Sequence, residues 1–168
     1  MSVKINYLKK KISTFSSNLV LFSNDKFNIS NLKKILSIAE FNYINDLLKS
    51  SDLKKNLLVF EVNSKKKVVL ISIKNNLKIS DIENLGAEFY GRVNYGKNNE
   101  YFLNSDSVDD KYKNFVSHFL HGLKLKSYEF KKYKTKKDSR IITINVIGRK
   151  NAPSSFNPVS YTHLTLPT

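Results

Sequence analysis

Residues 57–93 read LLVFEVNSKKKVVLISIKNNLKISDIENLGAEFYGRV, and this stretch decides the fold class. Two apolar runs, 57–62 and 68–73, predict strands that are joined by a polar turn over 63–67. Apolar residues occupy both parities of each run, which is typical of strands covered on both faces by helices. The stretch then changes to a helical spacing of apolar residues, namely Ile82, Leu85, Phe89 and Val93.

Similar patterns continue on both sides of this stretch. Alternation over 3–7 and an apolar run over 19–22 predict two strands, and 31–49 has the spacing of one or two amphipathic helices. Further strands are predicted at 101–103 and 141–147. Because strands and helices alternate, the predicted fold class is α/β, with a mixed sheet flanked by helices.

Side chains near two helix starts predict where these helices begin. Ser80 and Glu83 have the spacing of a capping box, and Gly91 and Gly96 should close the helix that this box opens. The clearest helix should open at Ser107 with two aspartates behind it, Asp109 and Asp110. Its apolar face should consist of Tyr112, Phe115, Val116, Phe119, Leu120 and Leu123.

Length and composition limit the class of protein. The chain has 168 residues, of which 40% are hydrophobic, so one domain with a buried core is expected. No apolar run approaches the roughly 20 residues that span a bilayer, and no signal peptide opens the chain. Without cysteine there is no disulfide or thiolate nucleophile. We therefore expect a cytoplasmic protein that has no membrane partner.

The net charge of +15 raises the question of a nucleic-acid partner. Lysine supplies nearly all of the positive charge, since the arginines are only Arg92, Arg140 and Arg149. Lysine, asparagine and isoleucine are the residues that AT-rich codons specify, so base composition explains the surplus. The run 131–137, five lysines around Tyr133 and Thr135, could meet phosphates, and its other interpretation is a solvated loop.

No set of residues assembles an active site. His118 and His121 have a spacing that can bind a metal on a helix, but the nearest carboxylates lie at the expected start of that helix. We interpret them as a partly exposed helix face. The five glycines match neither GxGxxG nor a P-loop, and no GxSxG or HExxH motif occurs. We assign no catalytic, cofactor-binding or metal-binding residue.

Residues 119–137, FLHGLKLKSYEFKKYKTKK, resemble the end of the amino-terminal domain of cytosolic leucyl aminopeptidases. That family shows a helix ending in Gly, then Leu, a Ser-Tyr pair and Phe-x-x-Tyr-Lys. Residues 51–55, the strand at 68–73 and Leu85-Gly86 agree with the family in order, although Leu53 replaces an aromatic and Lys54 a glycine. The resemblance spans roughly residues 3–148, and only 119–137 is specific.

The resemblance implies an α/β, macro-domain-like domain over 1–150, placed ahead of a catalytic domain that this sequence lacks. In the family, the catalytic domain holds two divalent metal ions, manganese or zinc, that activate water for peptide hydrolysis. The resemblance also implies a homo-oligomer, a hexamer in the family. The resemblance implies that the parent enzyme releases amino-terminal residues from peptides. Because this sequence lacks the family's metal-binding motif, we expect the fragment itself to be inactive.

The last ten residues have a separate origin in our interpretation. Residues 159–168, VSYTHLTLPT, resemble a translated transposon adapter of the kind used to prepare sequencing libraries. His163, the third histidine, falls within them. We expect residues 151–158 to begin a linker to the missing catalytic domain, and residues 159–168 to be an artefact. Two alternatives stay open: a free-standing macro-like module that binds a nucleotide, and a basic nucleic-acid-binding protein.

Overall fold

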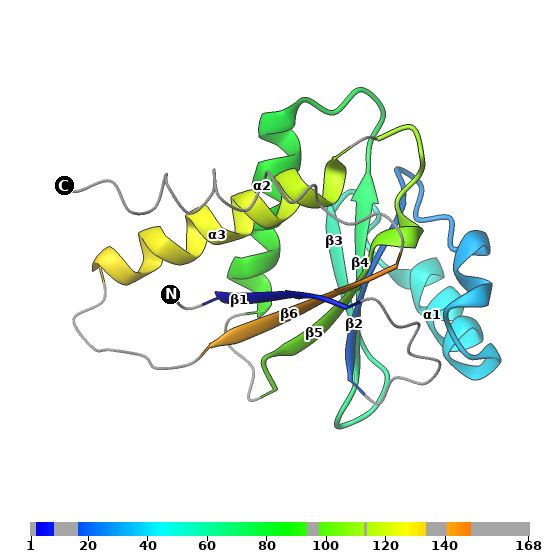
Figure 1. Ribbon diagram of the computed structural model, residues 1–168. Helices are drawn as coiled ribbons and strands as arrows, with labels where there is room; N and C mark the ends of the chain where they lie inside the picture. Colours follow the sequence, from blue (N-terminus) through cyan, green and yellow to red (C-terminus); the bar gives the residue numbers. More distant parts are fainter. Residues whose placement is uncertain (1–2, 9–16, 94–97, 113, 134–140, 149–168) are drawn as a thin grey trace.

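The computed structural model describes residues 3–8, 17–93, 98–112, 114–133 and 141–148 (Figure 1). Six strands, three α-helices and two 3-10 helices follow one another in these ranges. In chain order they are β1 (Val3–Tyr7), β2 (Asn18–Asn24), the 3-10 helix η1 (Ser30–Lys34), α1 (Ile38–Ser50), β3 (Leu57–Glu61), β4 (Lys67–Ile73), α2 (Ile79–Val93), β5 (Glu100–Asn104), the 3-10 helix η2 (Ser105–Ser107), α3 (Phe115–Tyr133) and β6 (Ile142–Ile147).

The six strands form one sheet in the order β1-β6-β5-β2-β4-β3. All neighbours are parallel except β3, which pairs antiparallel with β4 through the 62–66 turn. The predicted α/β class and the mixed sheet are confirmed. β1 pairs with the last strand of the chain, with Val3 opposite Ile142 and Tyr7 opposite Val146.

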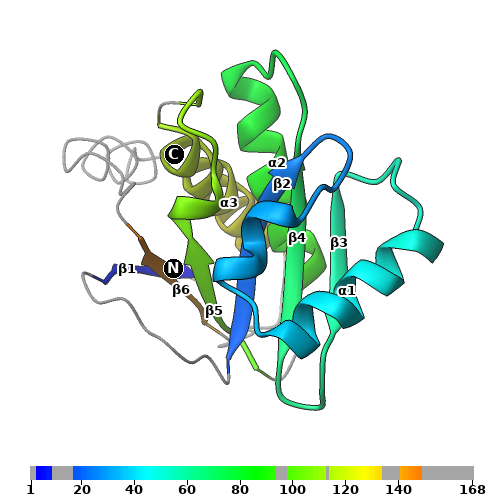
Figure 2. The same ribbon diagram turned by 90° about the vertical axis from the view of Figure 1, so that its right-hand side faces the viewer.

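Helices cover both faces of the sheet and separate two apolar clusters. α2 and α3 lie on one face, while η1 and α1 lie on the other, over β2, β4 and β3 (Figure 2). β4 is buried on both faces, as predicted. For β3, an edge strand, the prediction of two-sided cover is wrong in its second half, because Val59 is 41% exposed and Glu61 is exposed.

The predicted helix over 31–49 is divided at Ser37. η1 precedes the division, and α1 begins after Ser37 with a complete capping box. The Ser37 hydroxyl accepts the N–H of Glu40, and the Glu40 carboxylate accepts the N–H of Ser37.

The start of α2 differs from the prediction. Lys78 is the residue whose carbonyl accepts the first helical bonds, and its N–H donates to Asp81 Oδ2 at 2.9 Å. Ser80 therefore lies inside the helix, and the capping box of Ser80 with Glu83 is wrong. Gly91 lies within the last turn rather than closing α2, and Gly96 is outside the described residues.

α3 begins eight residues later than predicted and is longer than the family pattern suggests. Residues 105–107 form the separate turn η2, and Asn114 adopts a positive φ of 59° immediately before α3. Because Tyr112 precedes the helix, it reaches the core from a loop and donates its hydroxyl to the Lys74 carbonyl. α3 continues past Gly122 to Tyr133.

α2 and α3 cross at two glycines. A Cβ on Gly86 would overlap the Phe119 carbonyl, and a Cβ on Gly122 would overlap the Glu83 carbonyl. The contact is reciprocal, since each glycine meets the backbone three residues before the other. Both helices can approach closely because neither carries a side chain there.

Candidate functional site

The strand order of the sheet reverses at one point of its carboxyl edge. After β2 the chain continues to β3 and β4 on one side, and after β4 it crosses to β5 and β6 on the other. In open α/β sheets, ligands bind in the crevice where the strand order reverses in this way. Here that point lies between β2 and β5, which pair only from Asn18–Tyr101 to Val20–Leu103.

The hydroxyls of η2 form hydrogen bonds with the neighbouring strands at this point. Ser107 Oγ accepts the Phe22 N–H of β2 at 3.0 Å and donates to the Asn104 carbonyl at 2.6 Å. Ser105 Oγ donates to the Ile147 carbonyl of β6 at 2.8 Å. The turn after β5 thus connects β2, β5 and β6 where the strands separate.

Backbone N–H groups at this edge donate to the chain's own side chains. Asn24 Oδ1 accepts the N–H groups of Lys26 and Asn28, at 3.1 and 2.9 Å. Asn104 Oδ1 accepts the N–H of Asp106 at 2.9 Å. A phosphate site needs several N–H groups that point at the ligand. These donors are already used, which disfavours a nucleotide crevice here.

Replacing Ser107 with alanine tests the hydrogen bond that its hydroxyl accepts from the Phe22 N–H. The change leaves the Phe22 N–H without its acceptor, and such a loss costs about 1–3 kcal/mol of the free energy of unfolding. We expect faster hydrogen exchange at the Phe22 amide, measured by NMR. Ser50→Ala is the control, because its hydroxyl donates to Leu47 at an exposed position. Unchanged exchange at Phe22 would contradict the assigned role of Ser107.

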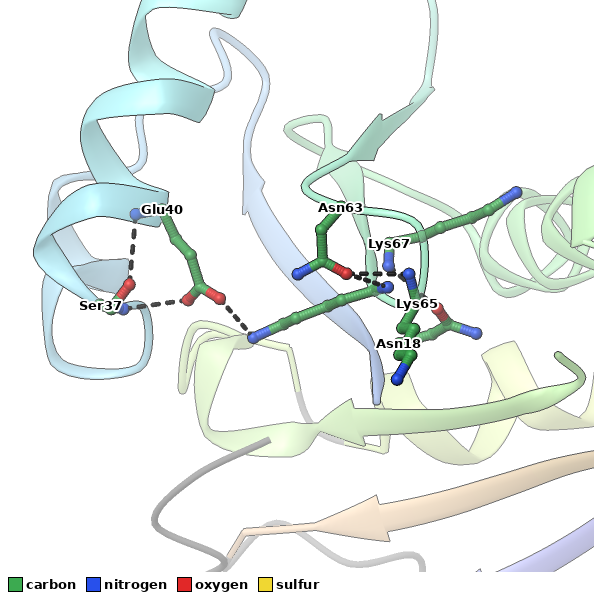
Figure 3. Close-up of polar contacts among 7 residues, drawn as sticks. Asn18, Ser37, Glu40, Asn63, Lys65 and Lys67 are labelled. Atoms are coloured by element: carbon green, nitrogen blue, oxygen red, sulfur yellow. Dashed lines mark hydrogen bonds and ion pairs between the residues drawn. The ribbon is translucent and has the colours of Figure 1, made fainter. Parts of the chain in front are cut away.

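A second polar group lies at the opposite, amino edge of the sheet (Figure 3). Lys66 Nζ lies 2.6 Å from Glu40 Oε1, and their side chains are only 7% and 18% exposed. Asn63 Oδ1 accepts the N–H groups of Lys65 and Lys66, each at 2.9 Å. The pair therefore joins the first turn of α1 to the β3–β4 turn.

Asn18 extends this group to β4 and β5. Its Oδ1 accepts the Lys67 N–H at 2.9 Å, and its Nδ2 donates to the carbonyls of Asn98 and Glu100. These contacts join the amino ends of β2, β4 and β5 at this edge of the sheet.

The pKa of Glu40 reflects two opposing causes. Burial alone raises the pKa of this carboxyl, and the hydrogen bond and charge of Lys66, with the bonds from Ser37, outweigh it. The pKa of Glu40 therefore lies below its ordinary value. The carboxylate stays ionised at neutral pH and keeps α1 attached to the β3–β4 turn.

The two helical histidines do not form a metal site with neighbouring carboxylates. His121 Nδ1 lies 2.7 Å from Glu83 Oε1 of α2, a carboxylate that the sequence predicts to cap this helix. Among the described residues, no group of three or more His, Cys, Asp or Glu side chains could hold a metal ion. The His121–Glu83 pair instead connects α2 and α3 beside Gly122.

The basic run 131–137 lies outside the residues whose side chains are described, so no contact is assigned to it. Burial lowers the pKa of Lys124 on the same helix.

Within the described ranges, no helix is long and apolar enough to cross a membrane.

Comparisons with known proteins identify what the fold is similar to. No protein-family model matches the sequence, and no curated protein matches it. A tomato leucine aminopeptidase mutant matches at a TM-score of 0.65 and 12% identity, over 96% of this chain and 35% of that chain. The macrodomain of Thermus aquaticus DarG matches at a TM-score of 0.55 and 8% identity, over 88% of this chain and 99% of that chain.

These likenesses establish the fold. The α/β sheet with helices on both faces is that of a macrodomain, as predicted. The chain spans about a third of the tomato enzyme that it matches, so the activity, metals and oligomeric state of such an enzyme do not follow from the match.

Proposed function

We propose that this chain is the non-catalytic amino-terminal domain of a two-metal leucyl aminopeptidase. The observation that carries the proposal is the tomato likeness, which takes in 96% of this chain and only 35% of a longer enzyme. The pattern of residues 119–137 supports the same family. Two divalent metal ions in the parent's other domain would activate water and polarise the scissile carbonyl.

Sequencing the source DNA across the codon for Pro158 tests this proposal. We expect the reading frame to continue beyond the codon for Pro158, with other residues in place of 159–168, into a domain with the two-metal ligands. A stop codon close to Pro158 would contradict it. The 168-residue chain itself should release no leucine from a leucyl peptide with manganese or zinc added. Metal-dependent release would contradict the inactive state of this domain.

A nucleotide-binding macro-like module is the second candidate, because the DarG macrodomain is matched over 99% of its length. The hydrogen bonds at the carboxyl edge disfavour it, since Asn24 and Ser107 already use the local donors and acceptors. We therefore expect no saturable heat when ADP-ribose is titrated into the chain by calorimetry. Saturable heat would contradict this expectation and favour the nucleotide-binding module.

A further inference from the structure

We propose that β3 pairs with β3 of a second copy of this chain, antiparallel and about a two-fold axis at Leu58, to form a weak dimer. β3 lies at one end of the strand order, and among the described residues only β4 pairs with it. Figure 2 shows β3 at the margin of the sheet. The inference goes beyond the proposed function, because it concerns copies of the present chain and needs no other domain.

The first argument is the direction of the backbone groups of β3. In an antiparallel pair, alternate residues point their N–H and C=O groups at the neighbouring strand. The Ser72 N–H donates to the Asn56 carbonyl at 2.8 Å, which places the even-numbered residues of this strand toward β4. Leu57 and Val59 therefore direct their N–H and C=O groups away from β4. Such a row of outward groups is a template for another strand.

The second argument is that the middle of this edge lacks the usual protection. Natural edge strands are commonly protected by charged side chains, prolines or bulges. Residues 57–60 read LLVF and pair regularly with β4, and Val59 is 41% exposed. At the end of the strand, Tyr43 donates its hydroxyl to the Glu61 carbonyl at 3.3 Å. The open part of the edge is therefore centred on 57–59.

The third argument is that the strand is complementary to itself. When Leu58 lies opposite Leu58 of the second copy, Val59 lies opposite Leu57, and Glu61 lies opposite Lys55. The two-fold axis repeats each of these pairs. The pairs between 57 and 59 each exchange two backbone hydrogen bonds, and opposite charges placed directly across two strands stabilise their pairing. Glu61 and Lys55 are both exposed, so their side chains are accessible to a second copy.

The charges favour β3 over β1, the other edge strand. Lys4 is the only charged residue in 3–8, so β1 offers no acidic side chain to Lys4 of a second copy. In β3, the Glu61 carboxylate lies 3.0 Å from Lys67 Nζ of the same chain. The Glu61 side chain is nevertheless 71% exposed, so its carboxylate has room for a second lysine.

Two charge reversals and their combination test the pairing. Glu61→Lys and Lys55→Glu each place like charges opposite one another, twice in every dimer. Sedimentation equilibrium of the 168-residue chain should show a dimer whose Kd rises about tenfold or more in each single variant. The double variant exchanges the two charges and should return the Kd close to that of the wild type.

Asp25→Lys and Lys54→Glu are controls that change the net charge by the same amounts. Both positions are exposed. Asp25 follows β2, away from the β3 edge, and Lys54 would lie opposite Val62 of the second copy rather than opposite a charge. These variants should leave the Kd nearly unchanged. Equal effects of the controls and of the reversals at 55 and 61 would assign the effect to net charge and overturn the inference.

Leu58→Cys tests the position of the axis, because the 168-residue chain has no cysteine of its own. The Leu58 backbone groups point at β4, so Leu58 would form a non-hydrogen-bonded pair with itself. The Cα atoms of such a pair lie about 4.5 Å apart, a separation that a disulfide spans. Mild oxidation should therefore convert this variant to a covalent dimer faster than Ile79→Cys, whose native side chain is 57% exposed.

Circular dichroism first establishes that each variant is folded. A wild-type chain that stays monomeric at its highest soluble concentration would overturn the inference. Crosslinking no faster at position 58 than at position 79 would do the same. These outcomes leave the proposed function intact, because the reading frame beyond Pro158 tests it separately.

Discussion

Alanine at Gly86 or at Gly122 should abolish the native fold or lower the free energy of unfolding by at least about 4 kcal/mol. Adding a methyl group to a well-packed core typically costs about 1–3 kcal/mol through displaced side chains. Here the added Cβ would overlap a backbone carbonyl, of Phe119 in one case and of Glu83 in the other. A helix backbone cannot rotate away as a side chain can, so α2 and α3 would have to separate.

Gly91→Ala is a matched control in α2. A Cβ there meets nothing within 4 Å, and alanine is favoured over glycine in a helix by about 1 kcal/mol. Urea unfolding followed by circular dichroism should show this variant unchanged or stabilised. A small effect of Gly86→Ala and Gly122→Ala in the same measurement would contradict the close crossing of the two helices.

Glu40→Gln should cost about 3–5 kcal/mol, because it leaves the buried Lys66 ammonium without its counter-charge. Glutamine can still accept the N–H of Ser37, so the cap of α1 is retained and the loss reports the charge. Adding Lys66→Met should restore most of the stability, since a buried ion pair can often be replaced by uncharged residues of similar volume. Urea unfolding of the single and double variants measures both effects.

Asp46→Asn is the control for this experiment, because Asp46 and Lys49 form an exposed pair at 3.0 Å with side chains 73% and 71% exposed. Such a pair contributes about 0–1 kcal/mol. A loss at Glu40 no larger than that at Asp46 would contradict the role of the Lys66 pair.

Acid should reduce the effect of Glu40→Gln. The pKa of Glu40 is lower in the folded chain than in the unfolded chain, so its stabilising contribution is fully present above about pH 4.5. It is lost as the pH falls through the folded-state pKa, where the native carboxylate takes up a proton. The difference in free energy of unfolding between wild type and Glu40→Gln should therefore shrink at low pH. A difference that grows in acid would have the wrong sign for this pair.

The sequence predicted the strands and the apolar stripes well, because both depend on local periodicity. The stripe of α2 is buried at Ile82, Leu85, Phe89 and Val93, as its spacing indicated. Helix starts were predicted less well, because several polar residues could serve as caps. At α2 the carboxylate of Asp81 accepts the N–H of Lys78, while Glu83 meets His121 of another helix.

The polar groups that connect distant segments had no signal in the sequence. Lys66 is one of three consecutive lysines, and nothing in its neighbours distinguishes the buried one from Lys65 and Lys67. Its partner Glu40 could have been found as the third residue after Ser37, but only as a helix cap. Gly122 was noted as the end of a helix, whereas its role depends on where α2 crosses α3.

The pairing of the first strand with the last has a consequence for synthesis on the ribosome. β1 finds its described partner only in β6, and the paired residues are 139 positions apart in sequence. At a synthesis rate of roughly 5–20 residues per second, β1 would remain unpaired for several seconds or more before β6 is made. Once β5 has been made, it also lacks its neighbour on that side until β6 follows. A chain released before Ile147 would expose a row of unpaired backbone groups, so chaperones and proteases should recognise early termination products.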